Sequence, residues 1–244
     1  MENIIEVSNL SKRFGSKTVV DNLSLFVTQG ETFGLLGHNG AGKSTSIDCI
    51  LGLKKCDNGN VKVLNMEPKK NRKQLFEQVG VQLQASHYQN NIKVCELCEE
   101  MSALYDNPRD YKELLEQFKL SEFLKHPVEK LSGGEKQKLS VLLSLIPNPT
   151  LLFLDELTTG LDTVARREVW KMLLNLKKQG VTIFLTSHYM DEVEILCDRI
   201  LLLKNGSEVI SGTVKKVISE SPYDTLENAY LWYMGEEIVD EDLF

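Results

Sequence analysis

Hydrophobic and polar positions alternate through the first thirty residues of the chain. The apolar positions in this stretch include Ile5, Val7, Val19, Val20, Leu23, Leu25 and Val27. Successive side chains of a strand point to opposite faces, so a period of two indicates strands with one buried face. Gly15 and Gly30 mark turns at the ends of these runs. The pattern predicts an antiparallel β region at the N-terminus.

The pattern changes after Glu31. A short apolar strand is predicted over residues 32–36, followed by a glycine-rich turn and by helical spacing from Ser44 to Leu53. Two further apolar runs, at residues 151–154 and 181–185, predict buried strands. Apolar residues on both sides of Asn205 and Gly206 predict a hairpin, because Asn-Gly favours a tight turn. These elements predict an α/β fold.

Helical spacing dominates the middle of the chain and returns near its end. From about His87 to Leu131 the apolar residues follow a helical period, and Asn107-Pro108 breaks it. A short C-terminal helix is expected around residues 226–231, followed by an acidic stretch from Glu236 to Phe244 that is expected to fray.

Composition narrows the classes of partner. The chain has 244 residues, of which 42% are hydrophobic and 26% are charged, so it can bury a core. Its net charge of −7 offers no general electrostatic attraction to nucleic acid. No nucleic-acid partner is expected. The N-terminus lacks the pattern of a secretory signal, and the longest apolar stretch, Leu139 to Leu154, is interrupted by Pro147 and Pro149. We expect a cytoplasmic protein that reaches a membrane only through a partner.

Five cysteines, an odd number, favour a reducing compartment over a disulfide framework. Cys95 and Cys98 have the spacing of half a zinc or redox site, but no second pair of ligands stands at a matching distance. Because their segment has helical character, two thiols in ordinary helix packing are the favoured interpretation.

The junction between the 32–36 strand and the following helix carries a phosphate-binding pattern of two glycines, a lysine and a hydroxyl. The motif consists of Gly37, His38, Asn39, Gly40, Ala41, Gly42, Lys43, Ser44 and Thr45. Glycines let backbone N–H groups approach a triphosphate, and the helix N-terminus adds a partial positive charge. Lys43 is expected to reach the β- and γ-phosphates of ATP, and Ser44 is expected to bind Mg²⁺. A glycine-rich turn without a ligand is the alternative for this motif alone.

A second apolar strand, over residues 151–154, delivers Asp155 and Glu156 at its C-terminal end. Parallel α/β sheets bind ligands at that edge. Asp155 is expected to belong to the Mg²⁺ shell, and Glu156 to be the general base or the group that orients the attacking water. A strand that ends in two solvated acids is the plainer interpretation, and the upstream phosphate loop disfavours it.

Between these motifs, Leu131-Ser132-Gly133-Gly134-Glu135 resembles the signature of the ATP-binding cassette (ABC) ATPases. The resemblance covers nearly the whole chain and implies a P-loop NTPase core with a mixed sheet and an inserted helical subdomain that carries the signature. It implies that residues 1–86 and 150–218 form the nucleotide-binding core with the antiparallel β region. Residues 87–149 would form the helical subdomain, and residues 219–244 the C-terminal helix and acidic tail.

The resemblance also implies roles for four residues outside the main motifs. Phe14 matches the aromatic that stacks on adenine, and Gln84 matches the glutamine that contacts Mg²⁺ and the attacking water. Asp162 lies in the loop that crosses the dimer interface, and His188 resembles the switch histidine at the γ-phosphate. Singly, such residues are usually core aromatics, solvated glutamines or structural histidines. Their order along the chain favours the functional interpretation.

The signature is chemically compatible with anion binding. Ser132 is expected to cap a helix that begins with Gly133 and Gly134 and runs to Leu145, and helix N-termini bind anions. In the family, that anion is the γ-phosphate on the other protomer, so the chain is expected to pair with a second nucleotide-binding subunit, either a copy of itself or a paralogue. Glu135 departs from the usual glutamine, and an acid there is expected to weaken ATP affinity modestly without abolishing hydrolysis. Leu157 and Val164 replace frequent prolines.

The resemblance therefore implies a transport-coupled ATPase whose catalytic residues are Lys43, Gln84, Glu156 and His188. Its partner would be a transmembrane permease subunit at the inner face of the cell membrane. Residues 226–231 resemble the C-terminal helix of bacterial drug, antibiotic and peptide exporter cassettes, which favours export. Two alternatives to a transport-coupled ATPase are a soluble cassette ATPase of DNA repair or translation, and a regulatory nucleotide-binding module with little hydrolysis. The chain shows neither the tandem cassettes of the first nor the lost motif residues of the second.

Overall fold

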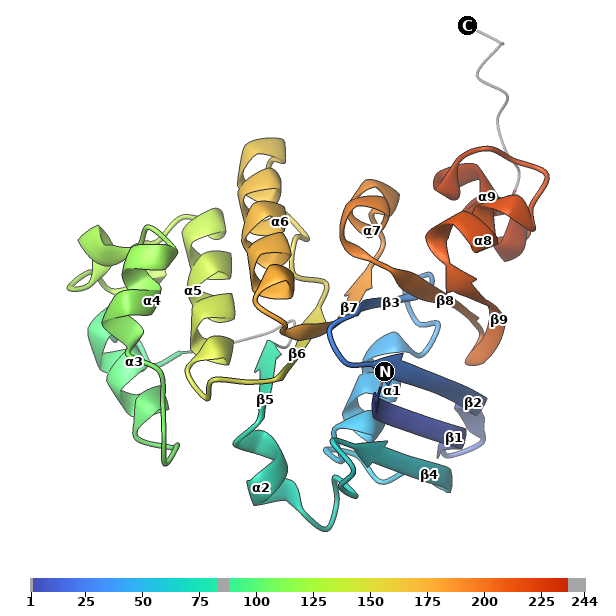
Figure 1. Ribbon diagram of the computed structural model, residues 1–244, viewed down its shortest axis with the longest axis horizontal. Helices are drawn as coiled ribbons and strands as arrows, with labels where there is room; N and C mark the ends of the chain where they lie inside the picture. Colours follow the sequence, from blue (N-terminus) through green and yellow to red (C-terminus); the bar gives the residue numbers. More distant parts are fainter. Residues whose placement is uncertain (1, 83–87, 237–244) are drawn as a thin grey trace, which may run out of the picture.

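Two β-sheets form the frame of the chain in the computed structural model, which describes residues 2–82 and 88–236 (Figure 1). The smaller sheet is antiparallel and has the order β2-β1-β4, formed by Lys17–Thr28, Asn3–Phe14 and Asn58–Val63. The larger sheet has the order β5-β6-β7-β3-β8-β9, formed by Val79–Gln82, Leu151–Asp155, Thr182–Ser187, Thr32–Leu36, Arg199–Lys204 and Ser207–Thr213. Its strands pair in parallel except β9, which is antiparallel to β8.

The helices follow the strands in an α/β order. They are α1 Lys43–Ile50, α2 Arg72–Phe76, α3 Val94–Ser102, α4 Tyr111–Gln117, α5 Gly133–Leu145, α6 Thr163–Lys178, α7 Met190–Leu196, α8 Val214–Ser219 and α9 Leu226–Met234. Two short 3₁₀ turns, Ser121–Phe123 and Val128–Lys130, connect α4 to α5. The predicted α/β class, mixed sheet, N-terminal antiparallel region and helical insertion are all confirmed.

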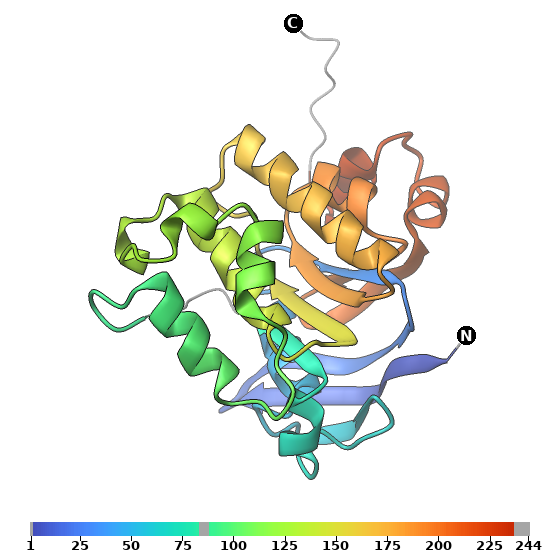
Figure 2. The ribbon, with the colours of Figure 1, turned by 60° about the vertical axis from the view of Figure 1, so that its left-hand side comes forward.

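The larger sheet separates the hydrophobic core into layers. Along β6, Leu152 and Leu154 pack with α3 to α6, whereas Leu151 and Phe153 pack with α1 and the antiparallel sheet. This follows from the alternation of side chains along a strand whose two faces are both buried. Figure 2 shows α6 lying across one side of the sheet and the antiparallel strands on the other. A third cluster joins α7, α8 and α9 to β8.

Some element boundaries differ from those expected. The helix expected over residues 44–53 ends at Ile50, because Gly52 takes a left-handed backbone with φ of 68°. Strand β7 is shifted by one to two residues from the expected 181–185. Strand β4, which completes the antiparallel sheet, was not predicted, because its sequence Asn-Gly-Asn-Val-Lys-Val is mostly exposed and only Val63 is buried. The predicted boundaries of the subdomains stay predictions.

The β8–β9 hairpin turns at Asn205 and Gly206, as the Asn-Gly pair predicts. Both residues have positive φ, 50° and 85°, which matches the tight turn favoured between antiparallel strands. A Cβ atom on Gly206 would lie 2.5 Å from the Val19 carbonyl oxygen. The turn therefore packs directly on the backbone of β2.

We expect Gly206→Ala to lower the free energy of unfolding by about 1–3 kcal/mol, because it adds both a strained φ and a backbone clash. Urea denaturation followed by circular dichroism measures this change. Gly180→Ala is the matched control, since Gly180 also has positive φ, of 89°, but nothing within 4 Å of its added Cβ. Equal losses in the two variants would show that the contact with Val19 contributes nothing.

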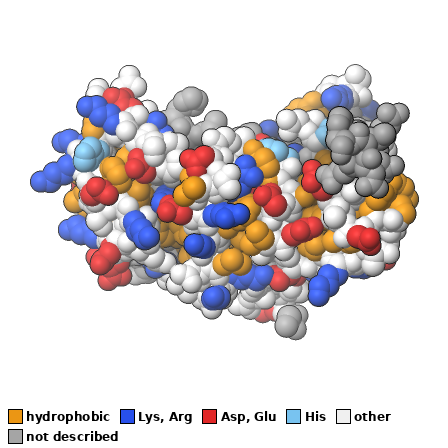
Figure 3. Space-filling model, turned by 90° about the horizontal axis from the view of Figure 1, so that it is seen from above, with side chains coloured by type: hydrophobic (Ala, Val, Ile, Leu, Met, Phe, Trp, Pro, Cys, Tyr) orange, Lys and Arg blue, Asp and Glu red, His pale blue; other side chains and the backbone are white. Residues whose placement is uncertain are grey.

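The surface carries charges of both signs. On the face shown in Figure 3, basic and acidic side chains are interspersed, and neither sign covers a continuous area. Among the described residues, no helix is long and apolar enough to cross a membrane. Cys95 and Cys98 lie on α3, and burial raises the pKa of the Cys98 thiol to about 12, which disfavours its thiolate form.

Candidate nucleotide-binding and catalytic site

Strand order brings three of the predicted motifs to one edge of the larger sheet. Strands β6, β7 and β3 are direct neighbours and run parallel, so their carboxyl ends meet at the same edge. Asp155 ends β6, His188 follows β7, and the loop 37–42 follows β3. Motifs far apart in the sequence thus converge.

The loop 37–42 joins β3 to α1 with a backbone that glycine permits. Gly42 has φ of 111°, and a Cβ atom there would lie 2.5 Å from the Val19 carbonyl oxygen. The N-cap residue of α1 is Gly42, which has no side chain to accept from the first N–H groups of the helix. The first N–H groups of α1 therefore lack a side-chain acceptor, which suits an anion-binding helix terminus.

Lys43 is buried at the centre of this loop, with 5% of its surface exposed. Its Nζ donates to the carbonyl oxygen of Gly37 at 2.7 Å and to that of His38 at 3.3 Å. It also forms an ion pair with Oε1 of Glu156 at 3.3 Å. The lysine of the phosphate loop and the acid that follows β6 therefore meet directly.

A second contact joins the same two motifs. The Ser44 hydroxyl donates to Oδ2 of Asp155 at 2.9 Å, although the two residues are 111 positions apart. The Thr186 hydroxyl donates to Oδ1 of the same carboxylate at 2.5 Å. Thr186 was not predicted as a site residue. The sequence feature that could have indicated it is a hydroxyl one position before the end of β7, the strand beside β6. Ser44 and Asp155 together offer the hard oxygen ligands that Mg²⁺ prefers, so the donor set fits that ion.

Glu156 follows β6 in a left-handed backbone conformation with φ of 50°. Its N–H group donates to the Thr186 hydroxyl at 3.0 Å and to the Thr186 carbonyl at 3.2 Å. Non-glycine residues in this conformation are uncommon and often lie at functional sites. The turn places the carboxylate against Lys43.

A cavity of about 300 Å³ opens over these residues. Its lining combines the phosphate loop with the acid, and consists of Val19, Asn39, Gly40, Gly42, Lys43, Ser44, Thr45 and Glu156. Val19 comes from β2, so the antiparallel sheet contributes a wall. The cavity is the natural position for a polyphosphate.

Two of the minor predicted residues are exposed near the ends of their strands. Phe14 ends β1 with 47% of its surface exposed, and the Nζ atoms of Lys12 and Lys54 lie 5.3 and 5.7 Å from its ring centroid. His188 is exposed, and its ring centroid lies 4.2 Å from that of Tyr189. Both are accessible to a ligand. Gln84 lies outside the described residues.

The predicted cap of α5 is present and is reciprocal. The Ser132 hydroxyl accepts from the Glu135 N–H group at 3.3 Å, and Glu135 accepts from the Ser132 N–H group at 2.7 Å. This capping box explains an acid at position 135, and the Ser-x-x-Glu spacing is a signal that predicts it. Asp162 caps α6 through its side chain alone, accepting from the N–H groups of Val164 and Ala165 at 2.9 Å.

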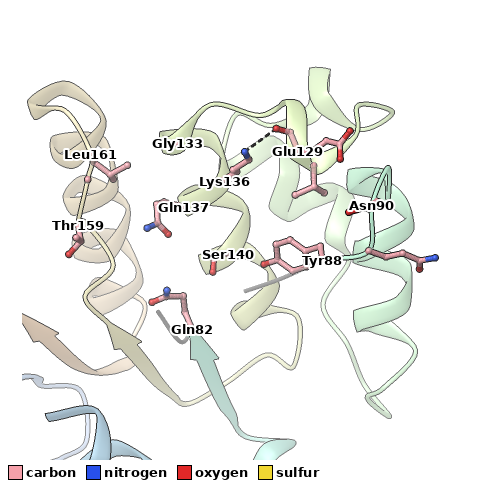
Figure 4. Close-up of a pocket in the computed structure, with 13 residues that line it drawn as sticks. Gln82, Tyr88, Asn90, Glu129, Gly133, Lys136, Gln137, Ser140, Thr159 and Leu161 are labelled. Carbon is pink, nitrogen blue, oxygen red and sulfur yellow. Dashed lines mark hydrogen bonds between the residues drawn. The ribbon is translucent and has the colours of Figure 1, made fainter. Parts of the chain in front are cut away.

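The signature lines a different cavity from the phosphate loop. A space of about 420 Å³ lies between α5, the end of β5 and the loop before α6, and Figure 4 shows Gln82, Gly133, Gln137 and Leu161 around it. It shares no lining residue with the cavity over Lys43. Figure 1 shows α1 and α5 in separate parts of the chain. Within one chain, the signature residues Ser132, Gly133 and Gly134 are not brought to the phosphate loop.

The fold and the meeting of Lys43, Ser44, Asp155 and Glu156 define a P-loop nucleotide-binding cassette. Residues 20–159 match the sequence family described as ABC transporter. The chain belongs to the ABC transporter family, as one of its ATP-binding cassettes. The family prediction is thereby confirmed.

Curated relatives and a solved structure agree with this assignment. The Nod factor export ATP-binding protein I of Sinorhizobium fredii is 40% identical over 222 residues, which cover 88% of this chain and 64% of that protein. The linearmycin resistance ATP-binding protein LnrL of Bacillus subtilis is 34% identical over 228 residues, which cover 91% of this chain and 73% of that protein. A structure described as the ATP binding subunit of an ABC transporter matches with a TM-score of 0.85 and 25% identity, covering 94% of this chain and 99% of that one. The chain thus spans less than two thirds of the length of the Nod factor export protein.

Proposed function

We propose that this cassette binds Mg·ATP, hydrolyses it between two copies of such a domain, and drives a membrane-spanning export partner. The observation that carries the proposal is the pair of contacts between the phosphate loop and the end of β6, Lys43 to Glu156 at 3.3 Å and Ser44 to Asp155 at 2.9 Å. These contacts bring a cation for phosphate, oxygen ligands for a metal and a base for water into one place.

ATP would bind with its phosphates in the cavity over Lys43. The N–H groups of the loop 37–42 and of the first turn of α1 would donate to phosphate oxygens, and Lys43 would exchange its ion pair for contacts with the β- and γ-phosphates. Ser44, Asp155 and Gln84 would hold Mg²⁺, which supplies charge neutralisation for the phosphates when bound.

Glu156 would act as the base or orienting group for the attacking water, because its carboxylate already borders the phosphate cavity. His188 would contact the γ-phosphate from the neighbouring strand end, and Gln84 would help place the water. Catalysis of this kind rests mainly on electrostatic positioning.

The signature requires a second subunit. Ser132, Gly133 and Gly134 line or flank a cavity that does not include the phosphate loop of the same chain. A neighbouring cassette, either a copy or a paralogue, would bring its own phosphate loop to this helix start, with Asp162 at the interface. The two cassettes would close on bound ATP and reopen after its hydrolysis.

Export is the transport direction that the relatives favour. The printed names of two relatives refer to Nod factor export and to linearmycin resistance. We propose that this chain likewise works at the inner face of the cell membrane with a permease subunit. A cassette of DNA repair or translation is not favoured by these relatives.

A direct experiment tests the proposal. Purified chain is given Mg·ATP, phosphate release is followed, and the oligomeric state is measured by gel filtration with and without ATP. We expect hydrolysis that stops when EDTA removes Mg²⁺. Absence of both ATP binding and hydrolysis would refute the proposal, and copurification from membranes would identify the permease.

Phe14→Ala should raise the KM for ATP about tenfold while kcat changes little. The exposed ring of Phe14 would stack on adenine, and stacking on a base contributes about 1–3 kcal/mol. Steady-state kinetics with Mg·ATP measure this split. Phe26→Ala is the matched control, because Phe26 is equally exposed at 46% but packs under Arg199. An unchanged KM would remove Phe14 from the nucleotide site.

A further inference from the structure

A buried carboxylate lies close to the loop that carries His188. Glu192, in the first turn of α7, has 3% of its surface exposed. Its Oε1 accepts a hydrogen bond from Nε1 of Trp170 on α6 at 3.0 Å, in a buried position. No predicted motif includes this residue, and the mechanism above does not use it.

The same carboxyl lies at the start of α7, which follows the His188 loop directly. Burial raises the pKa of Glu192, and the neighbouring Ser187 and Trp170 side chains oppose this rise by stabilising the charged carboxylate. Ser187 directly precedes His188, whereas the buried hydroxyl of Thr158, two residues after Glu156, has no hydrogen-bond partner among the described residues. Both hydroxyl residues are themselves 1% exposed. We name Trp170, Ser187 and Glu192 the Glu192 network.

Helix α6 supports the His188 loop from a second direction. The Arg166 guanidinium lies 3.9 Å from the ring centroid of Tyr189, next to His188 in the sequence, and its Nη1 is 3.6 Å from Oδ2 of Asp191. The Ser187 hydroxyl also accepts from the Tyr189 N–H group at 3.0 Å. The histidine is therefore exposed on a loop whose base is fixed by α6 and α7.

We infer that Glu192 is a positioning residue, which anchors the start of α7 to α6 and so holds the His188 loop in place for His188 to reach the γ-phosphate. The inference rests on the proposed function of the His188 loop. Burying a carboxylate is unfavourable unless polar partners satisfy it, and a satisfied buried network fixes geometry that apolar packing leaves looser. Small displacements of catalytic groups are costly, since about 1 Å can reduce a rate a hundredfold.

The test compares Glu192→Ala with Glu192→Gln in the full chain. The alanine variant removes every contact of the carboxyl and should lower kcat for ATP about tenfold or more, with KM within about twofold. The glutamine variant keeps an oxygen acceptor for Trp170 and should restore most of kcat. Val217→Ala, a buried truncation in the separate cluster of α7 to α9, controls for loss of stability and should leave kcat unchanged.

The outcomes separate this inference from the proposed function. If the natural chain hydrolyses ATP and Glu192→Ala retains full kcat, or changes only KM, the positioning role is wrong. If Glu192→Ala does not fold, Trp170→Phe, which removes the indole donor to Glu192 but keeps a buried aromatic ring, should lower kcat severalfold, and an unchanged kcat overturns the inference.

A readout independent of turnover uses the two tryptophans of the chain, Trp170 and Trp232. In a Trp232→Phe background, Trp170 emission should change when a non-hydrolysable ATP analogue binds, and His188→Ala should abolish the change without preventing binding. Trp170 emission that is unchanged by the bound analogue would contradict a link between the Glu192 network and the His188 loop, even if the chain proved inactive as an ATPase.

Discussion

Replacing Glu156 with glutamine is expected to reduce ATP turnover about 10²- to 10⁴-fold while ATP binding persists. The amide cannot accept the proton of an attacking water. It also removes the negative partner 3.3 Å from Lys43, so the lysine becomes available to phosphate without breaking an ion pair. Mg·ATP should therefore bind at least as tightly as in the natural chain.

Phosphate release and gel filtration with Mg·ATP measure the two halves of this prediction. The variant should accumulate as an ATP-dependent dimer, because hydrolysis no longer reopens it. Glu122→Gln, an exposed carboxylate on the turn between α4 and α5, is the matched control and should behave like the natural chain. Undiminished turnover in Glu156→Gln would assign the base elsewhere.

Lys43→Ala should lose nucleotide affinity, by about tenfold to a hundredfold in Kd. Hydrogen bonds to charged groups contribute about 1.5–3 kcal/mol, and every 1.4 kcal/mol is about a tenfold change in affinity. In the part of the chain that the structure describes, Lys43 is the lysine that lines the cavity over the phosphate loop. No other described lysine borders that cavity to replace it.

Titration with a fluorescent ATP analogue measures the affinity. Lys62→Ala, an exposed lysine of β4, is the matched control. Since the alanine variant also leaves the Glu156 carboxylate without its cation, thermal unfolding should be followed in parallel. A folded Lys43→Ala protein with unchanged affinity would show that phosphate is held by other groups.

The sequence predicts the parts of the site that lie in single continuous motifs. Strands β3 and β6 are short apolar runs followed by glycines or acids, and both begin and end within a residue of their predicted positions. Their convergence at one edge follows from the rule for parallel sheets. The strand order that brings these ends together, with β7 between β6 and β3, is a property of the tertiary structure and cannot be read from the individual motifs.

Contacts between distant segments could not be predicted in the same way. Thr186 reaches Asp155 across two neighbouring strands, and Glu192 reaches Trp170 between two helices. Neither pair has a spacing in the sequence that marks it. Strand β4 was not predicted because a solvated edge strand lacks the alternating apolar residues on which strand prediction depends.

The shape of the nucleotide cavity depends on a strand outside the phosphate-loop motif. The Val19 carbonyl oxygen lies 2.5 Å from where a Cβ would stand on Gly42 and equally close to one on Gly206. A slip of one residue in the pairing of β1 with β2 would turn the backbone groups of β2 over and present a different surface to both turns. Nucleotide affinity in this chain is thus sensitive to hairpin alignment, and insertions at the Gly15 turn would alter catalysis without touching a catalytic residue.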